Sequence, residues 1–180
     1  NTEIMYYLKV RKYYTPKVKL YTKTVRKYML KFKLNTGSTN STDDTDDTNE
    51  FYVLKPLFNK DKGFYPLGDI VVDTINTDID IVNSIINPEQ EFSTTLVAGA
   101  IDRPKDYELI YDNKYFTTKN RPLKNSGIHL SVWKPIPNTG FSAVGVVFNK
   151  GYTKPSLDEV VCVSNVFLKA AAKTPPKTGG

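Results

Sequence analysis

The side chains that most often perform catalysis are few and scattered in this sequence of 180 residues. His129 is the only histidine and Cys162 the only cysteine, and a catalytic pair would need both to meet beside an orienting third group. Each lies between aliphatic neighbours, which favours a partly buried strand histidine and a small buried thiol. One histidine and one cysteine cannot close a zinc site. The sequence also contains no glycine-rich phosphate loop or nucleophile-elbow motif.

Carboxylates form two groups, and neither has the spacing of a catalytic or metal site. The acidic stretch within residues 35–50 lacks the EF-hand spacing, with its glycine and terminal glutamate, so a solvated loop is favoured over a calcium site. Asp158 and Glu159 are adjacent, and on a strand they would point to opposite faces. The sequence therefore predicts no catalytic residue, no metal and no cofactor, and we expect a protein that is not an enzyme.

Positive charge gathers in the amino-terminal part of the sequence. Residues 1–34 contain ten basic residues and one acid, Glu3, which gives +9, whereas the remaining residues sum to −3. The basic residues are Lys9, Arg11, Lys12, Lys17, Lys19, Lys23, Arg26, Lys27, Lys31 and Lys33. Over 17–34 the lysines alternate with apolar residues, so a strand would place the two kinds on opposite faces. We predict a basic, β-strand-like arm over 1–34 and an acidic, polar linker or loop over 35–50.

Three kinds of partner would suit this arm. Lysines interleaved with tyrosines could neutralise the phosphates of a nucleic acid and stack on its bases. The same charge suits an anionic membrane, at roughly 1 kcal/mol per basic residue near the lipid. The arm could also add strands to an exposed sheet edge of a neighbouring subunit. The residues alone leave these alternatives open.

Two stretches about eighty residues apart share one pattern, VLKPLFNKDKGFYPLGDIV (53–71) and VWKPIPNTGFSAVGVVF (132–148). Each reads as two apolar residues, Lys-Pro, a turn, Gly-Phe and a strand entered near a second glycine. The repeated positions are Lys55, Pro56, Gly63, Phe64 and Gly68 in the first copy and Trp133, Lys134, Pro135, Gly140, Phe141 and Gly145 in the second. Proline cannot donate to a sheet ladder and glycine suits a positive φ, so each copy should be a strand, a tight turn and a returning strand. The repeat predicts two related sheets with one shared core.

Residues 51–170 read as one all-β domain. Short runs rich in β-branched and aromatic residues alternate there with Gly, Pro, Asn and Asp, and no window keeps a helical period for three turns. Residues 171–180 are predicted to be a disordered tail. No apolar run approaches the ~20 residues of a membrane-spanning helix, and no signal peptide is recognisable. We therefore expect an intracellular protein that is not secreted.

The second copy of the repeat resembles the vacuolar protein sorting-associated protein 62 family. The residues that match the family pattern in order are Trp133, Lys134, Pro135, Gly140, Phe141, Gly145, Lys154, Pro155, Ser156, Leu157, Asp158, Cys162 and Val163. The resemblance covers about residues 51–170, with departures at Val146, where Asp69 stands in the first copy, and at Tyr111, where a tryptophan is expected. It implies a β-prism-like domain of three small sheets, similar to multivesicular-body-associated β-prism domains, and no known catalysis.

These observations predict a non-enzymatic structural or interaction module that assembles as an oligomer into a larger complex. A composition rich in Lys, Asn, Thr, Ile and Tyr, together with the terminal Gly-Gly, suggests a virion component of a large DNA virus, either a minor capsid protein or a polyprotein product. The family resemblance suggests instead a peripheral membrane-trafficking module that binds anionic lipid through the arm. Nucleic-acid binding through the arm is the third alternative.

Overall fold

The computed structural model describes residues 19–36, 49–73, 75, 79–80, 85–86, 92–114 and 128–168. Within these residues the chain forms fourteen strands and two short 3-10 helices, so the predicted all-β class is confirmed. Among the same residues, no helix is long and apolar enough to cross a membrane.

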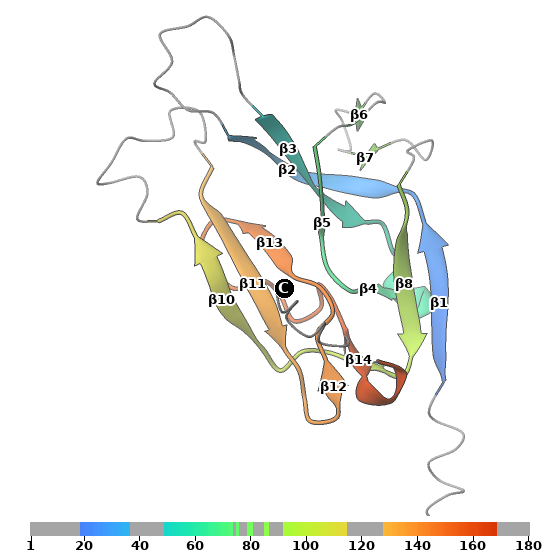
Figure 1. The fold of residues 1–180 in the computed structure, drawn as a ribbon. Coiled ribbons are helices and arrows are strands. Elements are labelled where there is room, and N and C mark those ends of the chain that lie inside the picture. Colours follow the sequence, from blue (N-terminus) through green and yellow to red (C-terminus); the bar gives the residue numbers. More distant parts are fainter. Residues whose placement is uncertain are drawn as a thin grey trace, which may run out of the picture.

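The first half of the chain forms two antiparallel sheets (Figure 1). One sheet has the order β5–β3–β2–β7–β6, made of β5 (Ile70–Val72), β3 (Asn49–Pro56), β2 (Tyr28–Thr36), β7 (Ile85–Ile86) and β6 (Ile79–Asp80). The other has the order β1–β8–β4, made of β1 (Leu20–Val25), β8 (Thr94–Gly99) and β4 (Tyr65–Pro66). The short helix η1 (Lys60–Lys62) connects β3 to β4.

The second half forms two further antiparallel sheets. One has the order β10–β11–β13, made of β10 (Asp106–Asp112), β11 (Leu130–Ile136) and β13 (Val147–Lys150). The other has the order β12–β14–β9, made of β12 (Phe141–Ser142), β14 (Cys162–Ser164) and β9 (Ile101–Asp102), and η2 (Asn165–Phe167) follows β14. The family resemblance implied three small sheets, whereas the described residues form four, arranged as two related pairs.

The strand pairings show that the two halves of the domain repeat one arrangement of strands. In the first unit β8 lies between β1 and β4, and β3 lies between β2 and β5; in the second, β14 lies between β9 and β12, and β11 lies between β10 and β13. The registers agree, because Tyr28 pairs with Pro56 as Tyr107 pairs with Pro135. A bulge follows two residues later in both β2 and β10. The repeated unit therefore spans 20–99 and 101–164, and it is much larger than the sequence motif.

The two units meet at the second glycine of each motif. A Cβ atom on Gly68 would lie 2.8 Å from the carbonyl oxygen of Val146, and one on Gly145 would lie 2.7 Å from the carbonyl oxygen of Leu67. The Asp69 N–H also donates to the carbonyl of Val146 at 2.9 Å. Backbones this close leave no room for a side chain, which explains why both positions hold glycine.

The turn glycines and the prolines of the motif also have matching roles. Gly63 and Gly140 have φ angles of 74° and 87°, the left-handed conformation that glycine adopts without strain. Pro56 and Pro135 are fully buried where β3 and β11 end.

The core follows the same duplication. Tyr28, Leu54 and Ile86 form one buried cluster in the first unit, and Tyr107, Trp133, Val147 and Val160 form a corresponding cluster in the second. A third cluster, of Val97, Val161 and Val163, lies between the two small sheets and joins the units. Burial of these apolar side chains supplies the main driving force that holds the sheets together.

The described part of the predicted arm is not an arm. β1 pairs with β8, and β2 pairs with β3 and β7, so both are structural strands of the first unit and residue 50 is not a domain boundary. The chain turns at Arg26 and Lys27, which sends β1 and β2 into different sheets, and the bulge at Lys31 shifts the parity within β2. A single lysine face over 17–34 therefore does not form. The prediction missed this because alternation reveals a strand but not which sheet it joins.

The predicted linker is shorter than expected. Residues 35–36 belong to β2 and residues 49–50 to β3, so residues 37–48 connect two paired strands. Residues 37–48, the predicted tail and the first eighteen residues lie outside the described residues.

Candidate anion-binding site

A pocket of about 480 Å³ opens beside β1, next to the β1–β2 turn and the segment that follows β3. Its lining residues are Lys23, Val25, Lys27, Leu57, Phe58, Asn59, Lys62, Phe64 and Leu96. Three ammonium groups thus share the lining with two phenyl rings and aliphatic carbon, and none of the lining residues is acidic. We call this the cationic pocket.

Local backbone contacts fix the two walls of the cationic pocket. The Leu57 N–H donates to the carbonyl of Lys27 at 3.0 Å, which holds the β1–β2 turn against the end of β3. The side chain of Asn59 accepts the Asp61 N–H at 3.0 Å and so starts η1. The Gly63 N–H closes the turn on the carbonyl of Lys60 at 3.1 Å. The backbone is therefore ordered, while the lysine side chains project from it.

The lysines of the cationic pocket have no counter-charge among the residues that the structure describes. Lys23, Lys27 and Lys62 are exposed, and none of them has a carboxylate at ion-pair distance within the described part of the chain. Asp61, exposed on η1, is the acid that adjoins them in sequence. Arg26 and Lys60, which adjoin lining residues in sequence, are also exposed, so positive charge extends beyond the pocket. An anion that entered would meet positive charge that no described carboxylate neutralises.

The positions of Lys23 and Lys27 carry the opposite charge in the second unit. Lys23 pairs with Leu96 on β8, and its counterpart Asp102 pairs with Cys162 on β14. Lys27 precedes the buried Tyr28, as Asp106 precedes the buried Tyr107. The cationic character therefore belongs to the first unit and not to the fold as such.

Asp102 and Asp106, the acids at these two positions, are satisfied within the chain. Asp102 accepts hydrogen bonds from the Arg103 N–H and from Asn138 Nδ2, both at 2.9 Å. Asp106 forms an ion pair with Lys154 at 2.8 Å, and this hydrogen bond is the main reason that the pKa of Asp106 falls below its ordinary value. Among the described residues, Lys23, Lys27 and Lys62 of the first unit have no such ion pair.

The structure disperses the basic residues that the sequence placed on one arm. The basic residues that are exposed on or beside β1 are Lys19, Lys23, Arg26 and Lys27. Lys31 is mostly buried, with its Nζ 2.8 Å from Asp69 Oδ2, and Lys33 Nζ lies 2.8 Å from Glu50 Oε1. The remaining basic residues of the predicted arm, Lys9, Arg11, Lys12 and Lys17, lie outside the described residues.

Sequence reasoning missed Lys62 as a member of the site. The turn after Asn59 is two residues longer than the turn after Asn138 in the second copy, and the longer turn carries Lys60 and Lys62. This difference in turn length is the feature of the sequence that could have identified Lys62.

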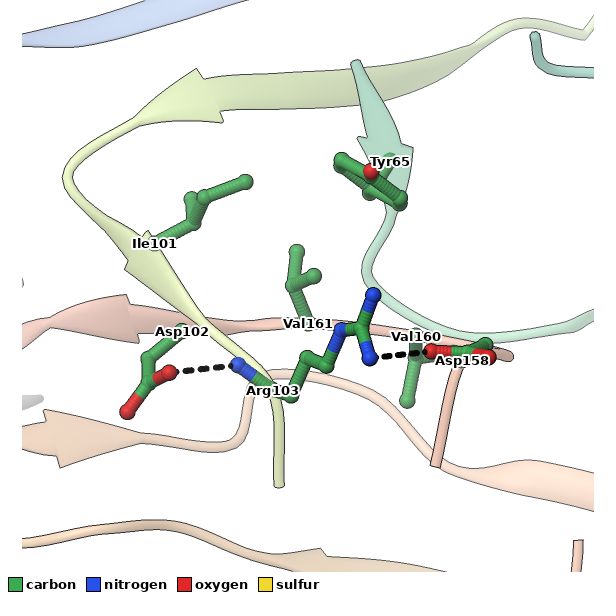
Figure 2. Close-up of a pocket in the computed structure, with 7 residues that line it drawn as sticks. All are labelled: Tyr65, Ile101, Asp102, Arg103, Asp158, Val160 and Val161. Atoms are coloured by element: carbon green, nitrogen blue, oxygen red, sulfur yellow. Dashed lines mark hydrogen bonds and ion pairs between the residues drawn. The ribbon is translucent and has the colours of Figure 1, made fainter. Parts of the chain in front are cut away.

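A second pocket, of about 250 Å³, lies between β4, β9 and residues 158–161 (Figure 2). Figure 2 shows the Arg103 side chain reaching to Asp158, and the two side chains form an ion pair at 2.9 Å. Val160 and Val161 contribute apolar surface, with Tyr65 and Ile101 on the opposite side. Because its charged groups already engage one another, this pocket offers less to an ion than the cationic pocket does.

The histidine and the cysteine lie apart in the fold. His129 is exposed, which corrects the expectation of a partly buried side chain, and its Nδ1 lies 3.0 Å from the Tyr152 hydroxyl. It stands next to β11, whereas Cys162 lies on β14 in another sheet. Cys162 is fully buried as predicted, and burial raises the pKa of its thiol to about 11. A thiol with this pKa stays protonated at neutral pH and is a poor nucleophile.

The adjacent acids also act separately, since Asp158 pairs with Arg103 and Glu159 pairs with Lys55 at 2.9 Å. Trp133 is buried in the core of the second unit, and its indole N–H donates to Ser131 Oγ at 2.8 Å.

Fold and surface together define an all-β module made of two copies of one unit, with a cationic pocket on the first. The family model for vacuolar protein sorting-associated protein 62 matches residues 33–174, which is most of the chain. The chain belongs to this family, and the resemblance seen in the sequence is confirmed. The match begins within β2, which agrees with the finding that β2 is part of the domain.

One solved structure with a similar fold is the crystal structure of GNIP1Aa from Chromobacterium piscinae. It is 15% identical to this chain, has a TM-score of 0.50 and covers 82% of the chain. The chain spans 24% of that protein, about a quarter of its length, and the likeness concerns the fold alone. A search of the curated proteins finds no match.

Proposed function

We propose that this chain is a non-catalytic binding module that attaches to an anionic membrane through the cationic pocket. One observation carries the proposal: Lys23, Lys27 and Lys62 line a single pocket together with phenyl rings and no carboxylate. A phospholipid presents the matching chemistry, with a phosphate for the ammonium groups and glycerol and acyl carbon for the rings. The description of the family, which refers to vacuolar protein sorting, is consistent with work at a membrane.

The distribution of charge favours a membrane over a nucleic acid. A nucleic acid needs a continuous cationic track with rings on which bases can stack. On β2 the track would have to continue through Lys31 and Lys33, but both are paired with carboxylates of the chain. The exposed ring of Tyr21 on β1 is an amphipathic group of the kind that is enriched at membrane interfaces.

The expected affinity of a single module is weak. At about 1 kcal/mol per basic residue near an anionic surface, the three lysines of the pocket and their exposed neighbours give roughly 3–5 kcal/mol. This corresponds to a dissociation constant near the millimolar range. Useful attachment would therefore require several modules on one surface, whose linkage raises the effective affinity.

Vesicle co-sedimentation tests the proposal. The full chain should bind vesicles of phosphatidylcholine mixed with phosphatidylserine, should not bind phosphatidylcholine alone, and should dissociate at high salt. The variant Lys23→Glu/Lys27→Glu/Lys62→Glu should lose at least tenfold in binding. The control Lys105→Glu/Lys134→Glu/Lys150→Glu changes net charge equally, at exposed lysines of the second unit.

Equal losses in both triple variants would show diffuse attraction and would overturn the pocket. A full chain that ignores anionic vesicles but binds single-stranded DNA with pocket-dependent affinity would replace the membrane proposal with nucleic-acid binding.

A second candidate function is assembly into a larger complex, of which a virion component is one form. The observation that favours it is the exposed apolar surface of β10, where Leu109 and Ile110 are 44% and 49% exposed. Residues 20–34 cannot act as a free strap, because they pair within their own unit. Light scattering during size-exclusion chromatography tests oligomer formation, and a truncation should stop at residue 18 because removing residues 1–50 would delete β1 and β2.

A further inference from the structure

Strand β10 is an edge strand in the described part of the chain. It pairs with β11 on one side, and no described strand pairs with its other side. Leu109 and Ile110 are about half exposed on it. A long apolar edge of this kind is normally covered, or it becomes a site where another strand adds.

The equivalent strand of the first unit is covered. Within β2, Tyr28 and Met29 pair with Ile86 and Ile85 of β7. The covering strand comes from the 21 residues between β5 and β8 (73–93), whereas only 11 residues (151–161) separate β13 from β14. Among the described residues, the second unit therefore has no strand that corresponds to β7 and covers β10.

The side chains show the consequence of this difference. Leu30 packs against the core of the first unit, whereas its counterpart Leu109 is 44% exposed. Lys31 is mostly buried in the first unit, and its counterpart Ile110 is 49% exposed in the second. Positions that are covered in one copy of the unit are thus apolar and open in the other.

Charge identifies the occupant of this edge. β10 carries no basic residue, and besides Asp106, which pairs with Lys154, it carries the acids Glu108 and Asp112. The eighteen residues that precede Lys19 carry Lys9, Arg11, Lys12 and Lys17 against the single acid Glu3. The same segment contains the apolar run IMYYL (4–8), so it combines the charge and the apolar side chains that the edge of β10 calls for.

We propose that residues 1–18 of one copy add as a strand to the β10 edge of a second copy, as β7 adds to β2 within the first unit. Main-chain hydrogen bonds would supply affinity, and the apolar and basic side chains would select this edge. The inference goes beyond the membrane function and uses a different surface, so either can fail alone.

Reach and direction favour a second copy over the segment's own chain. Eighteen extended residues span about 60 Å, which is enough to reach a neighbour. In Figure 1, β1 lies at the right side of the molecule and β10 at the left, so a segment that leaves the start of β1 would have to cross the whole molecule to reach its own β10. A neighbouring molecule can present its β10 without that detour.

A complementation experiment tests the proposal, with molar mass measured by light scattering during size-exclusion chromatography. The full chain should form an oligomer. A chain lacking residues 1–18 keeps β10 but has no donor segment, and Ile110→Arg keeps the donor but carries a cation on the exposed edge. Each should be monomeric alone, and an equal mixture should form a heterodimer.

Folding controls separate loss of docking from loss of structure. Val144→Arg replaces another exposed apolar residue of the second unit, 53% exposed and away from β10, and it should assemble like the full chain. Far-UV circular dichroism and the melting temperature should match for all variants. Leu8→Cys mixed with Ile110→Cys should form an interchain disulfide, since the native Cys162 is buried.

Three results would overturn the proposal. The first is a full chain that is monomeric at every concentration, and the second is a truncated chain that still assembles. The third is a mixture of the two monomeric variants that stays monomeric, because docking in trans requires them to complement each other.

Discussion

The ion pair of Lys31 and Asp69 in the first unit, which also contacts the backbone of Phe148 in the second, offers the sharpest test of how this fold is held together. Lys31 Nζ lies 2.8 Å from Asp69 Oδ2 and 2.6 Å from the carbonyl oxygen of Phe148, and the Phe148 N–H donates to Asp69 Oδ2 at 2.9 Å. The two charged side chains are only 14% and 2% exposed. At the matching positions the second unit holds Ile110 and Val146, so the fold itself contains the apolar alternative.

The magnitudes follow from burial. Burial raises the pKa of Asp69, and the nearby Lys31 ammonium lowers it less, so the cost of dehydrating the carboxylate exceeds the attraction. Asp69→Val alone would leave a buried ammonium without its carboxylate and should cost about 3–5 kcal/mol of unfolding free energy. Lys31→Ile/Asp69→Val removes both charges, and relative to Asp69→Val it leaves one further neutral group unpaired, the Phe148 carbonyl, at about 1–3 kcal/mol. The double variant should therefore be about 2 kcal/mol more stable than the single one.

Urea unfolding can be followed by the fluorescence of Trp133, which is the only tryptophan and lies in the core of the second unit. Circular dichroism on the same samples checks that sheet structure is lost in the same transition. An Asp69→Val variant that loses less than about 1 kcal/mol would show that the pair is hydrated in solution. A double variant as unstable as the two single variants summed would refute the coupling of Lys31 to Asp69.

Three further predictions use the same unfolding assay or simple chemistry. Burial raises the folded-state pKa of Asp69 above its ordinary value of 3.8, so this carboxyl contributes stability at low pH and loses that contribution as pH rises through the folded value. The free energy of unfolding of the wild type, measured relative to Asp69→Asn, should therefore fall from about pH 4 upward. A difference that rises with pH would contradict the burial of Asp69. Gly68→Ala should cost about 1–3 kcal/mol of unfolding free energy, because the added Cβ would collide with the Val146 backbone. Gly63→Ala should cost about 1 kcal/mol, because the added Cβ has open space and only the positive φ is unfavourable. The reverse order of the two costs would refute the close contact of the units. Cys162 should resist a thiol reagent at pH 8 until urea unfolds the chain, and reaction at the rate of an exposed thiol would show that β14 opens readily.

The sequence revealed the strands and half of the repeat because those features rest on constrained residues. Lys-Pro, the turn glycine and the contact glycine recur since each has a backbone role that few other residues can fill. The first strands of each unit stayed unrecognised as repeats, because buried residues such as Tyr28 and Tyr107 match while surface residues such as Lys23 and Asp102 do not. The charge of a surface residue can differ between the two units because the packing of the core does not depend on it.

The site was predicted in part and for a partly wrong reason. Charge segregation pointed to Lys23 and Lys27, but it also selected Lys31, whose partner Asp69 lies 38 residues away and cannot be inferred from spacing. Lys62 enters the pocket only because β2 pairs with β3 and brings the two turns together. Pairing and register decide such sites, and neither is encoded in local alternation.

The junction between the units sets the connectivity of the whole molecule. Ala100 stands alone between β8 and β9; its N–H donates to the carbonyl of Lys19 at 2.9 Å, and its own carbonyl accepts from the Ser164 N–H at 3.0 Å. The start of the first unit, the end of the second and the link between them therefore converge on one residue. A circular permutant that opens the chain at Ala100 and joins Ser164 to Lys19 by a short connection would place the second unit first while keeping every sheet. Because each sheet is built within one unit, the strand pairings do not depend on which unit comes first in the chain.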